Sequence, residues 1–143
     1  MCKFYSIGII FLFFLCGCPT MDNLDELPSD ATLTINNNLN KDILFYDSHI
    51  FPDTSINIES SFFNEKQKEY AQVKSKSSRN YPSTWIKLFE NKPLGYKLII
   101  FFFDKTTVET LPWDTIKKNY MILKRYDLSL EDLERMNWTI KYP

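Results

Sequence analysis

Apolar and polar residues alternate along the first regular segment of the chain. Leu33 and Ile35 are separated by one polar residue, so both apolar side chains share one face of an extended strand. The asparagine-rich stretch 36–40 favours a turn, because Asn tolerates left-handed backbone conformations. The apolar run 43–46 then predicts the partner strand of a hairpin, and a further short strand is predicted around 56–59.

A continuous apolar run, from Leu98 to Phe103, replaces this alternation later in the chain. Gly95 precedes the run and Asp104 follows it. Strands that are apolar at consecutive positions are typical of the centre of a sheet that is covered on both faces. The run therefore predicts a central strand and the hydrophobic centre of the domain.

Three segments with apolar residues at helical spacing predict short helices. The first follows the N-cap residue Ser83, the second covers 112–120, and the third follows the N-cap residue Ser129. Asp132 stands three residues after Ser129, which is the spacing of a capping box. We expect the third helix to begin most sharply, because its N-terminus carries both partners of that motif.

Two further strands are predicted beside these helices, at 121–124 and at 138–142. Strands dominate the first part of the chain and mix with helices in the second part. This order predicts an α+β fold with a mainly antiparallel, sandwich-like sheet arrangement and two to three short helices in the C-terminal half. A single globular domain is expected over residues 31–143.

The segment 64–79 is rich in basic residues and gives no clear period. Three interpretations remain open: an edge strand whose charges discourage pairing with another chain, a solvated loop, or a binding patch for an anionic glycan or phosphate. The cations of this segment are Lys66, Lys68, Lys74, Lys76 and Arg79.

The N-terminus has the features of a secretory signal. Lys3 supplies one positive charge, and the following run 4–15 is apolar or small throughout. A membrane-spanning helix needs ~20 apolar residues, and this run is too short for that role. We therefore expect residues 1–17 to be a leader that is removed.

The stretch Leu15, Cys16, Gly17, Cys18 resembles the lipobox of bacterial lipoproteins. In that family the thiol of the last cysteine is alkylated with diacylglycerol, the chain is cut just before it, and the new amine is acylated with a fatty acid such as palmitate. The resemblance implies that Cys18 is the lipidation site and that the lipid bilayer is a partner. Two or three acyl chains would hold the protein on a membrane essentially permanently.

The composition of residues 18–30 predicts an acidic, flexible tether between Cys18 and the domain. Asp22, Asp25 and Glu26 lie in this segment, and no basic residue does. The acidic stretch is similar to the one that follows the lipidated cysteine in surface-exported lipoproteins of the Bacteroidota. The resemblance leaves both the cell surface and the periplasmic face of the outer membrane open.

The C-terminal region resembles the ending of small uncharacterised lipoproteins from Bacteroidota. The similarity rests on the stretches 120–133 and 137–143. No activity comes with this resemblance. It implies an envelope protein with one compact domain.

Composition and charge exclude several classes of function. The chain has 17 basic and 18 acidic residues and a net charge of -1, which is unlike a generic nucleic-acid binder. It has a single histidine, and of its three cysteines only Cys18 would remain after cleavage of the leader. We therefore expect no metal site, no cofactor and no internal disulfide.

Catalytic groups are sparse. A hydrolase of the Ser-His-Asp type would need His49 as its base, and Asp47 stands two residues before it on the same predicted strand. Paired carboxylates for glycoside cleavage would draw first on Asp104. Three further candidates are Asp53, Asp114 and Asp127.

The sequence leads to two hypotheses of function. The first is a non-enzymatic envelope lipoprotein that acts by interaction with other envelope proteins, as an accessory or structural component. The alternative is a small glycan-binding module in which Trp85, Trp113 and Trp138 stack against sugar rings. The two differ in one observable: all three tryptophans should be largely buried on the first hypothesis, and two aromatic residues should line an open groove on the second.

Overall fold

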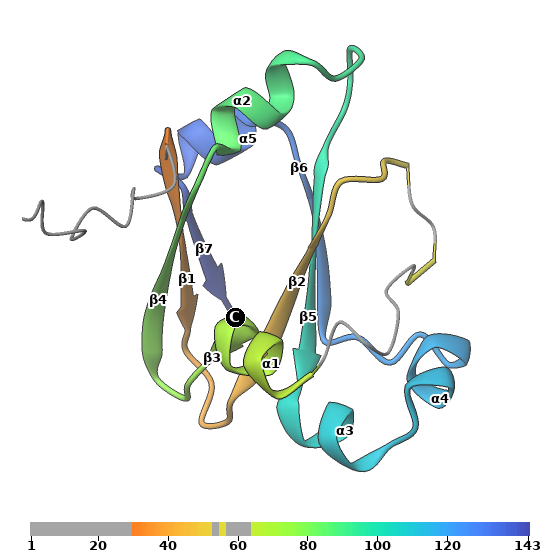
Figure 1. The fold of residues 1–143 in the computed structure, drawn as a ribbon. Helices are drawn as coiled ribbons and strands as arrows, with labels where there is room; N and C mark the ends of the chain where they lie inside the picture. Colours follow the sequence, from red (N-terminus) through yellow and green to blue (C-terminus); the bar gives the residue numbers. More distant parts are fainter. Residues whose placement is uncertain (1–29, 53–54, 57–63) are drawn as a thin grey trace, which may run out of the picture.

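The computed structural model describes residues 30–52, 55–56 and 64–143. Within these ranges the chain forms two β-sheets and five short helices (Figure 1). Antiparallel pairing dominates, so the predicted α+β class is confirmed. The predicted leader, the tether before Asp30, and the predicted strand beyond Ile56 lie outside the described residues.

The first sheet has three strands in the order β4-β1-β7. β1 (Ala31–Asn37) lies in the middle, antiparallel to β4 (Ser77–Ser83) and parallel to β7 (Thr139–Tyr142). Leu33 and Ile35 of β1 are fully buried, as the alternation predicts. The predicted closing strand of the chain is present as β7.

The second sheet has four strands in the order β3-β2-β5-β6. They are β2 (Ile43–Ser48), β3 (Gln72–Val73), β5 (Leu98–Asp104) and β6 (Lys124–Leu128). β5 pairs with strands on both edges, and its first six residues are all buried. The predicted central strand is therefore confirmed.

The predicted hairpin between residues 32–36 and 43–46 is wrong. β1 and β2 follow each other in the chain but belong to different sheets. Both edges of β1 are occupied, by β4 and by β7, so β2 has no free edge to join. β2 instead crosses to the second sheet, where Ile43, Leu44 and Phe45 are buried.

The two sheets pack face to face and enclose the main core. Phe45 of β2 contacts Tyr81 of β4, with 4.3 Å between the ring centroids. Phe102 of β5 stacks on Tyr142 of β7, with 5.2 Å between the centroids. These contacts across the interface account for the sandwich-like arrangement (Figure 1).

The second face of β5 is covered as well. Trp113 contacts Phe103 edge to face at 5.7 Å, and it opens the helix α4 (Trp113–Lys118). Ile116 on the same helix is fully buried. A strand with neighbours on both faces can be apolar at every position, which explains the continuous run in the sequence.

More helices form than the sequence predicts. Beside α4, the C-terminal half of the described chain contains α2 (Trp85–Glu90), α3 (Lys105–Thr110) and α5 (Leu130–Arg135). The additional helix is α3, whose N-cap is Asp104: its Oδ1 accepts a hydrogen bond of 3.0 Å from the backbone N–H of Thr107. The predicted capping box of α5 between Ser129 and Asp132 is confirmed.

The predictions of an edge strand or a loop for 64–79 miss the helix α1 (Glu65–Ala71). Asn64 caps α1, because its Oδ1 accepts a hydrogen bond of 3.0 Å from the N–H of Gln67. The amide of Asn64 also donates to the side chain of Gln67. This Asn-x-x-Gln spacing is a helix-start signal in the sequence. The rest of the segment enters β3 and β4.

The strand predicted at 121–124 is displaced. β6 begins only at Lys124 and continues to Leu128. The chain leaves α4 through Tyr120, which has a φ of 49°, and the N–H of Met121 still donates to the carbonyl of Ile116. The first main-chain contact with β5 is the hydrogen bond from Leu123 to Phe102, so pairing starts later than the apolar pattern indicates.

Helix α2 begins at Trp85, with Thr84 rather than Ser83 as the residue before it. Thr84 makes no side-chain cap hydrogen bond. The carboxylate of Asp30 fills this role from a distant part of the chain: Oδ1 and Oδ2 accept 2.9 Å hydrogen bonds from the N–H groups of Ile86 and Lys87. The residue at the end of the predicted tether is thus part of the folded domain.

We expect Asp30→Ala to lower the free energy of unfolding by about 1 kcal/mol, because two amide groups at the start of α2 lose their acceptor. Asp30→Asn keeps one acceptor oxygen and should lose about half as much. Urea unfolding followed by circular dichroism measures both values. Equal stability of the wild type and Asp30→Ala would contradict this distant cap.

Candidate functional site

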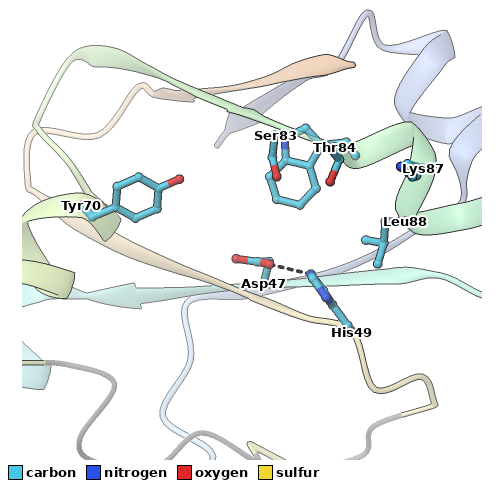
Figure 2. A pocket seen from close by; sticks show the side chains of 8 residues that line it. Asp47, His49, Tyr70, Ser83, Thr84, Lys87 and Leu88 are labelled. Carbon is cyan, nitrogen blue, oxygen red and sulfur yellow. Dashed lines mark hydrogen bonds and ion pairs between the residues drawn. The ribbon is translucent and has the colours of Figure 1, made fainter. Parts of the chain in front are cut away.

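A cavity of about 300 Å³ opens between the end of β4, the second half of β2 and the helices α1 and α2. β3 pairs with only Ile43 and Leu44 of β2, so the second sheet ends early on this side. Figure 2 shows the cavity and its side chains. The residues that line it are Asp47, His49, Tyr70, Ser83, Thr84, Trp85, Lys87 and Leu88.

Asp47 lies on the wall that β2 contributes. In a strand the side chains of alternate residues share a face, so Asp47 is on the face of Phe45, which contacts the first sheet. The carboxylate of Asp47 thus points into the space between the sheets, at its open end. Its Oδ2 lies 2.8 Å from Nε2 of His49 (Figure 2).

Tyr70 contributes an aromatic side chain from the last turn of α1, and its exposed fraction is 53%. Burial raises the pKa of Tyr70 above its ordinary value of 10.0; the negative charge of Asp47 raises it further, while Arg79 lowers it. The phenol is therefore protonated at neutral pH. A protonated phenol can donate a hydrogen bond as well as accept one.

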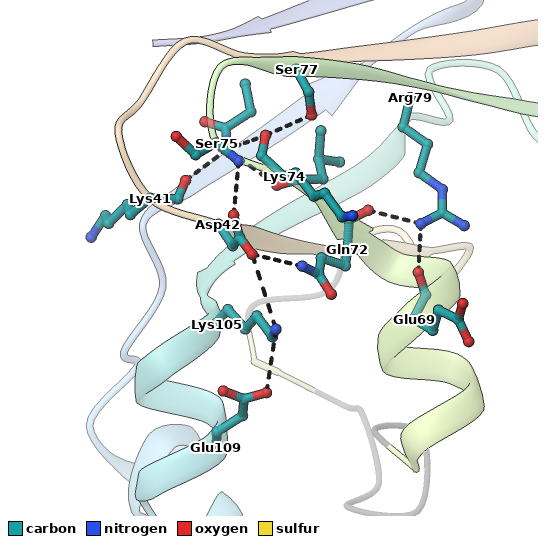
Figure 3. Close-up of polar contacts among 12 residues, drawn as sticks. Lys41, Asp42, Glu69, Gln72, Lys74, Ser75, Ser77, Arg79, Lys105 and Glu109 are labelled. Carbon is teal, nitrogen blue, oxygen red and sulfur yellow. Dashed lines mark hydrogen bonds and ion pairs between the residues drawn. The ribbon is translucent and has the colours of Figure 1, made fainter.

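Arg79 holds the Tyr70 ring in place. Its Nη1 donates to the backbone carbonyls of Glu69 at 2.5 Å and Gln72 at 3.0 Å, at the C-terminal end of α1 (Figure 3). The guanidinium lies 5.9 Å from the centroid of Tyr70 and 5.8 Å from that of Tyr81. Tyr70 also meets Tyr81 edge to face at 5.3 Å. The aromatic wall of the cavity is thus fixed from α1 and β4 together.

The three tryptophans of the glycan hypothesis occupy separate places. Trp85 is 6% exposed, lines the cavity, and donates from Nε1 to the carbonyl of Tyr81 at 2.8 Å. Trp113 packs on Phe103 at the outer face of the second sheet. Trp138 is partly buried against the core just before β7. Trp113 and Trp138 do not line the cavity, so the three do not form one stacking platform.

Three of the five basic residues of 64–79 are engaged within the fold. Lys68 pairs with Glu65 at 3.0 Å, and Lys76 donates to the carbonyl of Asn38 at 2.6 Å. Arg79 donates to the carbonyls at the end of α1. The neighbouring polar network joins Asp42 to Gln72 at 2.6 Å (Figure 3). These three cations therefore make separate local contacts within the fold.

The candidate carboxylates for glycoside cleavage are also separated. Asp104 caps α3 and pairs with Lys41 at 2.5 Å. The hydrogen bond from Lys41 lowers the pKa of Asp104; burial opposes the shift, and hydrogen bonds from Thr107 add to it. Asp127 pairs with Ile99, at the opposite end of β5 from Asp104, and it binds Arg125 at 2.7 Å.

The other two carboxylates considered for glycoside cleavage are Asp114 and Asp53. Asp114 is exposed in the first turn of α4. Asp53 lies outside the described residues, as do the lipobox residues Leu15, Cys16, Gly17 and Cys18.

In the ranges that the structure covers, no three His, Cys, Asp or Glu side chains gather closely enough to hold a metal ion. None of the helices in those ranges has the length and apolar character that a membrane crossing requires.

Comparison of the chain with known protein families, with curated proteins and with solved structures finds no match. Sequence reasoning identified Asp47, His49 and Trp85 as residues of interest, but it missed Tyr70, because the helix that carries Tyr70 was not predicted. The signal that would have found this helix is the cap formed by Asn64 and Gln67.

Proposed function

We propose that the chain is a lipid-anchored lipoprotein of the cell envelope, held on the outer membrane through an acylated Cys18. The observation that carries the proposal is the sequence Leu15, Cys16, Gly17, Cys18 directly after a short apolar leader. The resemblance of the C-terminal stretches to small Bacteroidota lipoproteins supports the same location. The domain over 31–143 would act without catalysis, by binding other envelope proteins.

The position of the folded domain supports a tethered arrangement. The described fold begins at Asp30 and Ala31, shortly after Cys18 in the chain. At ~3.3–3.6 Å per residue, the segment between Cys18 and Ala31 spans at most about 47 Å when fully extended. Because Asp30 is tied to α2, the tether would join the domain at the end where α2 begins.

The geometry of the candidate catalytic groups supports a role without chemistry. Nε2 of His49 is occupied by the carboxylate of a residue two positions before it, which is a local pair in an exposed setting. Asp104 serves a helix cap and an ion pair, and Asp127 serves an ion pair at the other end of β5. In each case the side chain has a structural partner within the fold.

Metabolic labelling with a fatty-acid analogue tests the anchor. We expect the wild type to carry label and Cys18→Ala to lose it, because the thiol that bears the diacylglycerol is gone. Cys16→Ala is the matched control: it changes the neighbouring cysteine and should keep the label. Label retained in Cys18→Ala would overturn the proposal.

Two further measurements address the location of the domain and its interaction role. Protease treatment of intact cells decides between the surface and the periplasmic face. Chemical crosslinking in intact cells, followed by purification of the full chain, should recover the same envelope protein repeatedly from wild type and less of it from Cys18→Ala. Recovery of the chain alone at native expression level would contradict a role in protein interaction.

A further inference from the structure

We infer that the cavity bounded by Asp47, His49, Tyr70 and Trp85 is a binding site for a short neutral saccharide, of one or two rings. This site differs from a platform of three tryptophans, since it combines one exposed tyrosine with a cluster of polar groups. The inference goes beyond the proposed interaction role and does not depend on acylation of Cys18.

The rim of the cavity offers hydrogen-bonding groups to a ligand. Among the residues that the structure describes, no donor reaches Oδ1 of Asp47, whose other oxygen binds His49. The Asp30 carboxylate caps α2, so the hydroxyl of Thr84 is not used for capping although it stands at the start of that helix. A carboxylate oxygen and a hydroxyl at the rim of one cavity can bind adjacent hydroxyl groups of a ligand.

The cavity also offers apolar surface to a ligand. Arg79 and Tyr81 hold the Tyr70 ring from α1 and β4, while about half of this side chain is left exposed. Trp85 and Leu88 add apolar atoms on the side of α2. Figure 2 shows Tyr70 and Leu88 on opposite sides of the cavity, with Asp47 between them. A sugar ring has apolar C–H faces and a polar rim, which matches this combination.

The charges around the cavity are mixed. Asp47 and Lys87 bring one negative and one positive side chain to the cavity, so neither sign is favoured. The start of α2 would otherwise attract an anion, but its amides already bind Asp30. These observations favour a neutral polyhydroxylated ligand over a phosphate or a carboxylate. The volume of about 300 Å³ suits a small ligand.

The test uses the full-length lipoprotein in an amine-oxide detergent, because glucoside detergents would compete for a sugar site. The probes are glucose, galactose, mannose, N-acetylglucosamine and its β1,4-linked dimer, with glucuronic acid as the charged comparison. Saturation-transfer NMR detects binding and titration calorimetry measures the dissociation constant. We expect saturable binding of at least one neutral probe.

Two variants assign the site. Asp47→Asn keeps the shape of the side chain but removes its charge, and it should weaken binding at least about tenfold, as expected for the loss of a charge-assisted hydrogen bond. Tyr70→Ala removes the exposed ring and should weaken binding similarly, while Tyr70→Phe retains the ring and should bind more tightly than Tyr70→Ala. Tyr120→Ala, at a tyrosine 41% exposed outside the cavity, is the matched control and should leave binding unchanged.

Circular dichroism and thermal unfolding check that each variant folds; if Tyr70→Ala does not fold, Asp47→Asn and Tyr70→Phe still decide. The inference is overturned if no neutral probe binds up to about 10 mM, if glucuronic acid alone binds, or if folded Asp47→Asn binds as the wild type does. Acylation is measured separately with Cys18→Ala, so failure of the saccharide site and failure of the anchor give different results.

Discussion

Replacing Phe102 with Ala is expected to lower the free energy of unfolding by about 3–5 kcal/mol, the range for a fully buried aromatic residue. Phe102 is 0% exposed at the centre of β5. Its ring contacts Tyr142 at 5.2 Å and Tyr126 at 5.7 Å, so it joins both sheets. Truncation would leave a cavity at the interface between the sheets, where the backbones on both sides resist collapse.

Urea unfolding of the detergent-solubilised chain measures this loss. The slope of the free energy of unfolding against urea concentration should stay unchanged, which shows that the same transition is being compared. Leu94→Ala is the control: Leu94 is fully exposed between α2 and β5, so its replacement should change stability by less than about 0.5 kcal/mol. Equal effects at the two positions would contradict the placement of Phe102 between the sheets.

Asn37→Ala is expected to cost about 2–4 kcal/mol, because a buried polar side chain that satisfies several backbone groups is removed. Asn37 is 1% exposed. Its Nδ2 donates to the carbonyls of Lys41, Val73 and Lys74 at 2.8 to 3.1 Å, and its Oδ1 accepts from the N–H of Leu39. This one amide ties the β1–β2 connection to the β3–β4 connection.

Asn37→Asp sharpens the test, since it keeps the size of the side chain and the acceptor for Leu39 but exchanges the donor for a charge that faces three carbonyls. The folded state would favour the protonated acid and raise its pKa above the ordinary value of ~3.9. The folded state then binds more protons than the unfolded state, so stability falls as the pH rises above that value. Equilibrium unfolding at pH 3.5 and pH 7 measures the difference.

Asn38→Ala is the neighbouring control. Asn38 is exposed, and its amide donates at 3.0 Å to the carbonyl of Pro143. A change of less than about 1 kcal/mol is expected there, because water can replace a lost exposed hydrogen bond. Similar losses for Asn37→Ala and Asn38→Ala would show that burial of the Asn37 amide contributes nothing.

Local signals in the sequence predicted individual elements well. The Ser129–Asp132 capping box, the buried run before Asp104, and the alternation of Leu33 and Ile35 all correspond to elements in the structure. Each of these signals depends on residues within a few positions of one another. Capping and face alternation are set by such local geometry, which is why the sequence is enough to find them.

Pairing between elements could not be predicted in the same way. The apolar pattern of 43–46 fits a strand in either sheet, and the two edges of β1, where a hairpin would place β2, are taken by β4 and β7. The prediction of Ser83 as the N-cap of α2 was wrong for a related reason. Its acceptor is Asp30, more than fifty positions from Ile86 in the chain, so no local spacing reveals it.

The sequence alone was enough to predict the α+β class and most of the core residues, and it carries the lipobox resemblance at Cys18. These depend on composition and short-range pattern. Only the tertiary structure decided which strands share a sheet, that Trp113 and Trp138 pack away from Trp85, and that Tyr70 stands across a cavity from α2. A cavity forms where elements that are distant in the chain leave space between them, and local sequence signals do not report this. Here the space is left because β3 pairs with β2 at only two positions.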